Sequence, residues 1–253
     1  MGGAVVLLLG LVDDLRPLSP WQKLLGQGGA AVLAVGMGLR CTGMGNVYLA
    51  SGLTVLWLVG VSNALNLIDM MDGLSSGVGA IASLGFALLG FIQGQHAIVL
   101  LGCALAGALL GFLRYNFYPA RIFMGDMGSL FTGFMLGGMG IVVANGQGGL
   151  EGNLIAGLIL GIPLFELVFV AIMRIRNRRP LLLASRDHFA QRMLRLGLSV
   201  RQVVGIAYAV GVILMCIALE VSGRSPLWIW ISVVGICTAA VAWGGRLSKI
   251  DMG

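Results

Sequence analysis

The sequence predicts an all-α protein, a polytopic transmembrane helical bundle with about nine membrane segments. Two observations predict it: the composition and the pattern of apolar runs. Of 253 residues, 58% are hydrophobic and 10% are charged, whereas a soluble domain has about 25% charged residues. The mean hydropathy is +0.97. Apolar runs recur at about the 20 residues that a helix needs to cross a bilayer. These runs lack the alternation of barrel strands, so helices are predicted.

Nine apolar segments divide the chain, and we expect residues 1–253 to form a single membrane domain. The segments span about residues 2–12, 22–40, 50–67, 74–94, 97–113, 128–146, 153–173, 203–221 and 226–243. The first segment has about eleven residues before Asp13, fewer than a crossing needs. It also lacks the basic start and the cleavage site of a signal peptide. We therefore expect an incomplete first helix.

The positive charges predict an orientation. If the loop after the first segment is assigned to side A, and the sides then alternate, side A holds 14 of the 16 Lys and Arg residues. Side B holds only Arg40 and Arg224. The positive-inside rule then makes side A cytoplasmic, and residues 174–202 become a cytoplasmic Arg-rich loop. Because the basic residues lie in short loops between apolar runs, we expect contact with membrane lipid and no nucleic-acid partner.

The aspartates gather on the same side, although the positive-inside rule does not sort acidic residues. The three Glu do not follow them: Glu151 is on side B, Glu166 lies within a segment and Glu220 is near side B. We infer that side A carries a site built from short carboxylates. The seven residues are Asp13, Asp14, Asp69, Asp72, Asp126, Asp187 and Asp251.

Two acidic clusters lie at segment ends. In residues 10–14, two adjacent carboxylates repel each other unless a cation is near, and Lys23 or Arg16 is a candidate cation. The alternative without a function is a solvated helix end. In residues 62–73, two Asn and two Asp recur every three residues. Because each step of three falls about 60° short of a turn, the row is expected to leave the helix near Asp69 and to turn before Gly73. The alternative without a function is that these side chains only form hydrogen bonds between helices.

The stretch 114–129 joins two apolar segments and holds a third acidic residue. Pro119 is expected to stop a helix, and the two Gly residues beside Asp126 let backbone approach a ligand closely. A helix is predicted to start after Asp126, which suits a phosphate with a metal beside it. The fourth polar stretch, 185–192, contains one of only two His residues. Its Arg-rich surroundings are equally explained by contact with anionic lipid.

Together these stretches predict a chemistry. Carboxylates without accompanying Cys or His favour Mg²⁺ over zinc, with Mn²⁺ as an alternative. Mg²⁺ beside Arg and Lys indicates a polyphosphate substrate, for which catalysis consists mainly of positioning and charge neutralisation. A membrane location indicates that the second substrate is a lipid. The residues alone thus predict Mg²⁺-dependent phosphoryl transfer to a lipid on the cytoplasmic side.

The same stretches resemble the polyprenyl-phosphate N-acetylhexosamine-1-phosphate transferases of glycosyltransferase family 4. The matching sequences are LVDDLRPLSPWQKLLGQ, NALNLIDMMDG, FLRYNFYPARIFMGDMGSL, PLFE and SRDHFAQRMLRLGLS. The resemblance implies that a UDP-N-acetylhexosamine gives its sugar-1-phosphate to undecaprenyl phosphate, and that UMP leaves. It further implies the first membrane step of cell-envelope glycan synthesis, at the cytoplasmic face of a bacterial inner (plasma) membrane.

The resemblance also implies residue roles. Asp13 is similar to the aspartate that activates the lipid phosphate, Asp14 to its supporting neighbour and Asp126 to a Mg²⁺ ligand, so these three are the catalytic candidates. Asp126 and Asp69 are the metal candidates. Direct attack on the diphosphate is preferred over a covalent aspartyl intermediate. The substrate-binding candidates are Lys23, Asn63, Asn66, Asp69, Asp72, Asn116, Arg121 and His188.

Two departures from the family pattern stand out. Relatives usually carry His-x-His-His in the last cytoplasmic loop, whereas only His188 remains in the sequence His-Phe-Ala-Gln here. Relatives also have about two further helices before the paired Asp, so we expect the DNA upstream of Met1 to encode them in frame.

Three alternative functions remain at this stage. A transporter would hold its acids at the bilayer midplane. A CDP-alcohol phosphotransferase would show Asp-Gly-x-x-Ala-Arg, but residues 72–77 lack the Ala-Arg pair. A catalytically impaired scaffold of a glycan assembly complex is the third. A homodimer is also left open, because the many Gly residues make close helix packing motifs common by chance.

Overall fold

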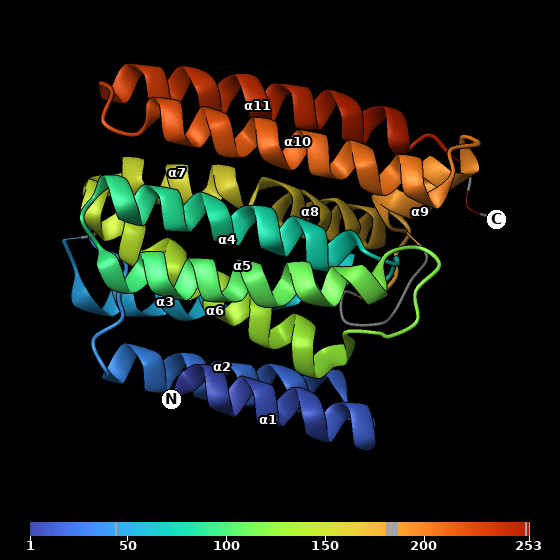
Figure 1. The fold of residues 1–253 in the computed structure, drawn as a ribbon, viewed down its shortest axis with the longest axis horizontal. Helices are drawn as coiled ribbons and strands as arrows, with labels where there is room; N and C mark the ends of the chain where they lie inside the picture. The colour runs from blue at the N-terminus through green and yellow to red at the C-terminus, as the bar shows by residue number, and fades with distance from the viewer. Residues whose placement is uncertain (44, 181–186, 251, 253) are drawn as a thin grey trace.

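The computed structural model describes residues 1–253 except 44, 181–186, 251 and 253. The described part consists of helices and connections without a strand (Figure 1). The helices are α1 (Gly2–Leu15), α2 (Pro20–Gly36), α3 (Val47–Ile68), α4 (Leu74–Ile92), α5 (His96–Asn116), α6 (Gly125–Gln147), α7 (Gly149–Ile159), α8 (Gly161–Arg176), α9 (Phe189–Arg195), α10 (Val200–Val221) and α11 (Pro226–Leu247). The predicted all-α fold class is thereby confirmed.

The nine predicted segments all correspond to helices, but the seventh is not continuous. It consists of α7 and α8, which are bent by 84° at Leu160. Pro163 explains the break, because its ring would clash with the carbonyl of Ile159 four residues earlier in a straight helix. In the first turn of a new helix, the missing N–H of proline is harmless. The Arg-rich stretch 174–202 contains a short helix, α9, over Phe189–Arg195.

Within the part of the chain that the structure describes, six helices are long and apolar enough to cross a membrane, and the bent pair adds a seventh crossing if it counts as one span. The six are α3, α4, α5, α6, α10 and α11. Helix α1 has 14 residues and α2 has 17, below or at the lower limit of about 17 residues for a crossing. The expectation that the first segment is too short to cross agrees with the length of α1.

One end of the bundle collects the polar connections. Figure 1 shows the C-terminal ends of α1, α3, α5, α8 and α11 at the same end of the bundle as the N-terminal ends of α2, α4, α6 and α10. This end is side A of the sequence analysis. The connections and helix ends there carry six of the seven aspartates, while Asp251 lies outside the described residues, as does Arg186.

Local sequence signals define several helix boundaries at side A. The Ser19 hydroxyl accepts a hydrogen bond from the Gln22 N–H, and the Gln22 side-chain oxygen accepts one from the Ser19 N–H, so that this capping box starts α2. Ser199 and Gln202 repeat the motif at the start of α10. Between α3 and α4 the chain turns through Gly73, which has φ +79°. The predicted exit from the helix near Asp69 is confirmed, since α3 ends at Ile68.

Close helix packing positions the aspartates. A Cβ atom on Gly10 of α1 would lie 2.4 Å from the Cα atom of Met127 on α6. A Cβ atom on Gly133 of α6 would lie 2.6 Å from the Cα atom of Ser62 on α3. Side chains larger than hydrogen would therefore separate these helices. The two glycines let α6 approach both α1 and α3, so that residues from all three helices meet at side A.

Candidate active site

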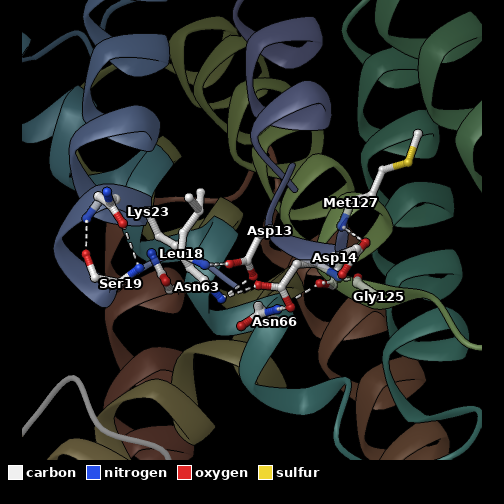
Figure 2. Close-up of polar contacts among 12 residues, drawn as sticks. Asp13, Asp14, Leu18, Ser19, Lys23, Asn63, Asn66, Gly125 and Met127 are labelled. Carbon is white, nitrogen blue, oxygen red and sulfur yellow. Dashed lines mark hydrogen bonds and ion pairs between the residues drawn. The ribbon is translucent and has the colours of Figure 1, made fainter. Parts of the chain in front are cut away.

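Asp14 of α1 caps the N-terminus of α6. Its Oδ1 accepts a hydrogen bond from the Asp126 N–H at 2.9 Å, and its Oδ2 accepts one from the Met127 N–H at 3.0 Å (Figure 2). A carboxylate at this position satisfies free amides and interacts favourably with the helix dipole. Gly125 turns the chain into α6 with φ +65°. A Cβ atom there would lie 2.7 Å from the Asp14 Oδ2 atom.

Lys23 of α2 joins two carboxylates from different helices. Its Nζ lies 2.6 Å from Oδ2 of Asp126 and also forms an ion pair with Oδ2 of Asp13. The remaining oxygen of Asp13 accepts a hydrogen bond from the Leu18 N–H at 2.7 Å. Only 8% of the Asp13 residue is exposed. The repulsion expected between adjacent Asp13 and Asp14 is thus relieved by two separate partners, Lys23 and the start of α6.

Asn66 of α3 completes the contacts of Asp126. Its Nδ2 donates to Oδ1 of Asp126 at 3.0 Å and to Oγ of Ser129 at 3.0 Å. The Ser129 hydroxyl in turn donates to the Gly125 carbonyl at 2.8 Å. Both oxygens of Asp126 therefore have donors, one from α2 and one from α3. Figure 2 shows the side chains of α1, α2 and α3 converging on the start of α6.

Asn63 lies one helical turn before Asn66 on α3. It donates to the Val59 carbonyl at 2.8 Å and to Oε1 of Gln27 on α2. Gln27 is fully buried, and its Nε2 has no hydrogen-bond partner among the described atoms. The sequence reading missed Gln27, although its position four residues after Lys23 was a signal that both face the same side of α2. The polar row on α3 thus has a counterpart on α2.

Asp69 is half-buried at the end of α3. Burial, together with the nearby charges of Asp126 and Asp14, raises its pKa to about 7. Two neighbouring carboxylates disfavour a third ionised carboxylate unless a cation joins them. The structure therefore brings Asp14, Asp69 and Asp126 into one electrostatic neighbourhood.

The surroundings of Asp69 and Asp126 contain carboxylate oxygens but, among the described residues, no complete set of side-chain ligands for a metal ion. In the described residues, no three His, Cys, Asp or Glu side chains form a group that could enclose a metal ion by themselves. Mg²⁺ in phosphoryl-transfer sites is usually held by one or two carboxylates and completed by substrate phosphates and water. Asp69, whose pKa is raised by burial and then by the charges of Asp126 and Asp14, carries the carboxylate oxygens that Mg²⁺ prefers.

Two further candidates, Asp72 and Asn116, form hydrogen bonds with the backbone near the loop between α5 and α6. Oδ2 of Asp72 accepts from the Ala120 N–H at 2.9 Å. The buried Asn116 accepts from the Gly73 N–H at 3.1 Å and donates to the Ile122 carbonyl at 3.0 Å. Their side chains connect this loop to the turn between α3 and α4. Direct contact of either residue with substrate stays a prediction.

Arg121 and His188 are not in the contacts around Asp126. Arg121 is exposed on the α5–α6 loop. His188 is buried at the start of α9, where its Nδ1 lies 2.6 Å from Oε1 of Glu166. Glu166 was not among the predicted site residues, although the stretch PLFE that contains it was one of the matching motifs. Substrate contacts of Arg121 and His188 stay predictions.

Comparison with known proteins places these residues in a family. The model of glycosyl transferase family 4 matches residues 1–144, which contain the contacts around Asp126. The chain is 35% identical over 242 residues to a probable undecaprenyl-phosphate N-acetylglucosaminyl 1-phosphate transferase of Bacillus subtilis. That match covers 92% of this chain and 67% of the relative.

Two other relatives match different shares of the chain. A decaprenyl-phosphate N-acetylglucosaminephosphotransferase of Mycobacterium tuberculosis is 32% identical over 238 residues, with 82% of this chain and 59% of the relative covered. A phospho-N-acetylmuramoyl-pentapeptide-transferase of Lactiplantibacillus plantarum is 43% identical over 137 residues, covering 50% of this chain and 43% of the relative. The chain thus spans about two thirds or less of the lengths of these relatives. With both the family model and the Bacillus relative in agreement, the chain belongs to glycosyl transferase family 4.

Proposed function

We propose that the protein transfers a sugar-1-phosphate from a UDP-N-acetylhexosamine to undecaprenyl phosphate and releases UMP. An oxygen of the lipid phosphate would attack the sugar-bearing phosphorus. The bond from that phosphorus to the bridging oxygen would break, and the electron pair would leave with UMP. The printed names of the relatives support the sugar-phosphate transfer and the polyprenyl-phosphate acceptor.

The observation that carries the proposal is the position of the Lys23 ammonium between Asp13 and Asp126, next to the start of α6. A cation held at the end of membrane-spanning helices suits a phosphate whose lipid chain remains in the bilayer. The two carboxylates keep Lys23 in place before the substrate arrives, so the ammonium need not be reoriented during the reaction.

In this proposal each residue has a role that follows from its position. Asp13 removes the proton of the lipid phosphate when that group arrives protonated, and Lys23 attracts and orients its charge. Asp14 holds the start of α6 against α1, which keeps Asp126 at the correct distance from Lys23. Asn66 orients the Asp126 carboxylate. Direct displacement is preferred, because two positioned phosphates need no covalent enzyme intermediate.

Asp126 and Asp69 are the residues that would hold Mg²⁺, together with the diphosphate of the donor. When bound, Mg²⁺ would neutralise negative charge on the phosphates and make UMP a better leaving group. The arrangement of Asp69 beside two other carboxylates supports this assignment. Mn²⁺ would serve the same oxygen ligands.

We further propose that side A faces the cytoplasm of a bacterial cell and that the protein is a multi-pass protein of the inner membrane. The excess of Lys and Arg at this side supports the orientation. UDP-sugars are soluble and charged, so the face that binds them must be open to the compartment that contains them.

The test uses membranes from cells that express the complete gene, supplied with undecaprenyl phosphate, Mg²⁺ and a panel of UDP-sugars. We expect UMP release with one UDP-N-acetylhexosamine, dependent on both the lipid and the divalent ion. Absence of UMP release with every donor, at verified expression, would contradict the proposal and favour a scaffold. Ion or solute flux without turnover would instead favour a transporter.

A further inference from the structure

The side chain of Tyr208 on α10 reaches the turn between α3 and α4. Its hydroxyl donates a hydrogen bond to the carbonyl of Gly73, which lies 135 positions earlier in the chain. A tyrosine hydroxyl that is partly buried in a helical bundle usually finds such a partner, but the partner can belong to any neighbouring segment. Here it belongs to the turn that follows Asp69. The contact therefore connects α10, which lies beyond the residues 1–144 matched by the family model, to the candidate active site.

The packing of α4 against α10 has room for the Tyr208 ring because residue 77 is glycine. The two helices run side by side (Figure 1). A Cβ atom on Gly77 would lie 2.1 Å from both Cζ and Oη of Tyr208, so a larger residue would displace the ring from α4. Two turns further along α4, a Cβ atom on Gly85 would lie 3.0 Å from Cγ of Met215 on α10. Glycines on α4 thus let α10 come close enough for the Tyr208 hydroxyl to reach the turn.

Both polar groups of the Gly73 backbone are bound by side chains of other helices. The Gly73 N–H donates to Oδ1 of Asn116 on α5 at 3.1 Å, and the Gly73 carbonyl accepts from Tyr208 on α10. The carbonyl also accepts from the Gly77 N–H at 3.1 Å, within the start of α4. A carbonyl oxygen has two lone pairs, so it can serve both donors. The turn is therefore held by α5 and α10 in addition to the helices that it connects.

Two carboxylates of the candidate site depend on the position of this turn. Asp69 is the C-cap residue of α3, and Asp72 directly precedes Gly73. Oδ2 of Asp72 accepts from the Ala120 N–H at 2.9 Å, which joins the turn to the loop before α6. A shift of the Gly73 backbone would move its neighbours with it. Since displacements of about 1 Å can be costly for catalysis, a hydrogen bond at Gly73 can affect groups that Tyr208 does not touch.

We propose that Tyr208 is a positioning residue that acts through the Gly73 carbonyl and holds the turn 69–73 in place for binding of the sugar-diphosphate donor. This inference rests on the transferase function proposed above, in which Asp69 serves the donor diphosphate. The residues assigned to the lipid phosphate, Asp13 and Lys23, lie on α1 and α2 and do not depend on this turn. Loss of the hydroxyl should therefore affect one substrate and not the other.

Tyr208→Phe tests the hydrogen bond alone, because it removes the hydroxyl and keeps the ring. We expect the KM for the UDP-sugar to rise about threefold to tenfold, the range that one hydrogen bond contributes, with the KM for undecaprenyl phosphate unchanged. A purely structural role would lower the amount of folded enzyme, and hence the maximal rate, without changing either KM. The matched control is Ser83→Ala, which removes a buried hydroxyl that donates to the Gly79 carbonyl within α4 at 2.7 Å. It should leave both KM values unchanged.

Hydrogen–deuterium exchange in the full-length protein supplies a readout that needs no turnover. Tyr208→Phe is expected to speed the exchange of the backbone amides in residues 69–77, because local opening of the turn becomes easier. Ser83→Ala should leave the exchange of these amides unchanged. Gly77→Ala removes the same contact by displacing the ring, so it should also raise the KM for the UDP-sugar. Adding Tyr208→Phe to Gly77→Ala should have no further effect, since both act on one hydrogen bond.

The outcomes separate this inference from the proposed function. An unchanged KM for the UDP-sugar in Tyr208→Phe, while the wild type turns over, would overturn the inference alone. An equal rise in KM for both substrates would do the same, as would unchanged exchange of residues 69–77. Absence of UMP release from the wild type would overturn both.

Discussion

The ammonium of Lys23 on α2 lies 2.6 Å from Oδ2 of Asp126 on α6, a residue 103 positions further along the chain. The same ammonium contacts Asp13, so one lysine links three of the helices that meet at side A. This link joins the residues that the proposal assigns to the lipid phosphate with those assigned to the donor diphosphate. It is also the contact that the sequence could least specify, since nothing local to either residue predicts it.

Lys23→Met is expected to lower UMP release at least about a hundredfold, because two carboxylates would lose their shared cation and repel the phosphate. Lys23→Arg should retain part of the activity, since it keeps the charge but changes the geometry. The rates are measured in membranes at saturating UDP-sugar and lipid. Near-normal turnover of Lys23→Met would show that the bridge is not needed.

The cap formed by Asp14 predicts a difference between two substitutions. Asp14→Ala removes both acceptors of the α6 amides and is expected to cost about 1 kcal/mol of stability, with lower activity. Asp14→Asn keeps an acceptor and should melt close to the wild type. Thermal unfolding in detergent, followed by intrinsic fluorescence, measures the difference. Equal melting temperatures for Asp14→Ala and the wild type would argue against the cap.

Gly10 predicts a steric effect on the site. Gly10→Ala is expected to destabilise the protein on the order of 1–3 kcal/mol and to reduce turnover, because the added Cβ would separate α1 from α6. The matched control is Gly29→Ala on α2, where a Cβ would have no neighbour within 4 Å. Melting temperature and UMP release are measured for both variants. A harmless Gly10→Ala would mean that α1 and α6 pack less closely than described.

Asp69 predicts a pH dependence. Its pKa rises from an ordinary value of 3.8 to about 7 in the folded protein. The folded state therefore binds more protons than the unfolded state in this interval, so this residue's contribution to stability falls as the pH rises from about 4 to about 7. In metal-free buffer, Asp69→Asn should remove that part of the decline in melting temperature between pH 5 and pH 8. Identical pH profiles for variant and wild type would contradict the assignment.

The membrane helices were predictable from the sequence because a bilayer imposes a length and a composition on each crossing. The turn after Asp69 was predictable too, since a polar row with a period of three cannot stay on one helix face. The break between α7 and α8 was not predicted. Pro163 lies inside an uninterrupted apolar run, and composition alone does not distinguish a broken span from a kinked one.

The candidate site also has parts that the sequence predicted and parts that it did not. The gathering of carboxylates at side A followed from counting crossings, which requires no knowledge of contacts. By contrast, Asn116 and Asp72 bind the backbone of the α5–α6 loop. The sequence does not distinguish an amide or carboxylate that holds a loop in place from one that binds a ligand, because the residue types are the same. The pairing of Glu166 with His188 joins residues 22 positions apart across a chain connection. Only the packing of α9 against α8 brings them together.

The central claim is that Asp13 and Asp126, at the side A ends of α1 and α6, act on the reacting phosphates: Asp13 as the base for the lipid phosphate and Asp126 as a ligand of Mg²⁺. The most direct measurement compares UMP release by Asp13→Asn, Asp126→Asn and Glu151→Gln, a control at the opposite side, in membranes with equal protein levels. We expect the two aspartate variants to lose turnover while Glu151→Gln retains it. Near-normal turnover by either Asp13→Asn or Asp126→Asn would contradict the role assigned to that residue.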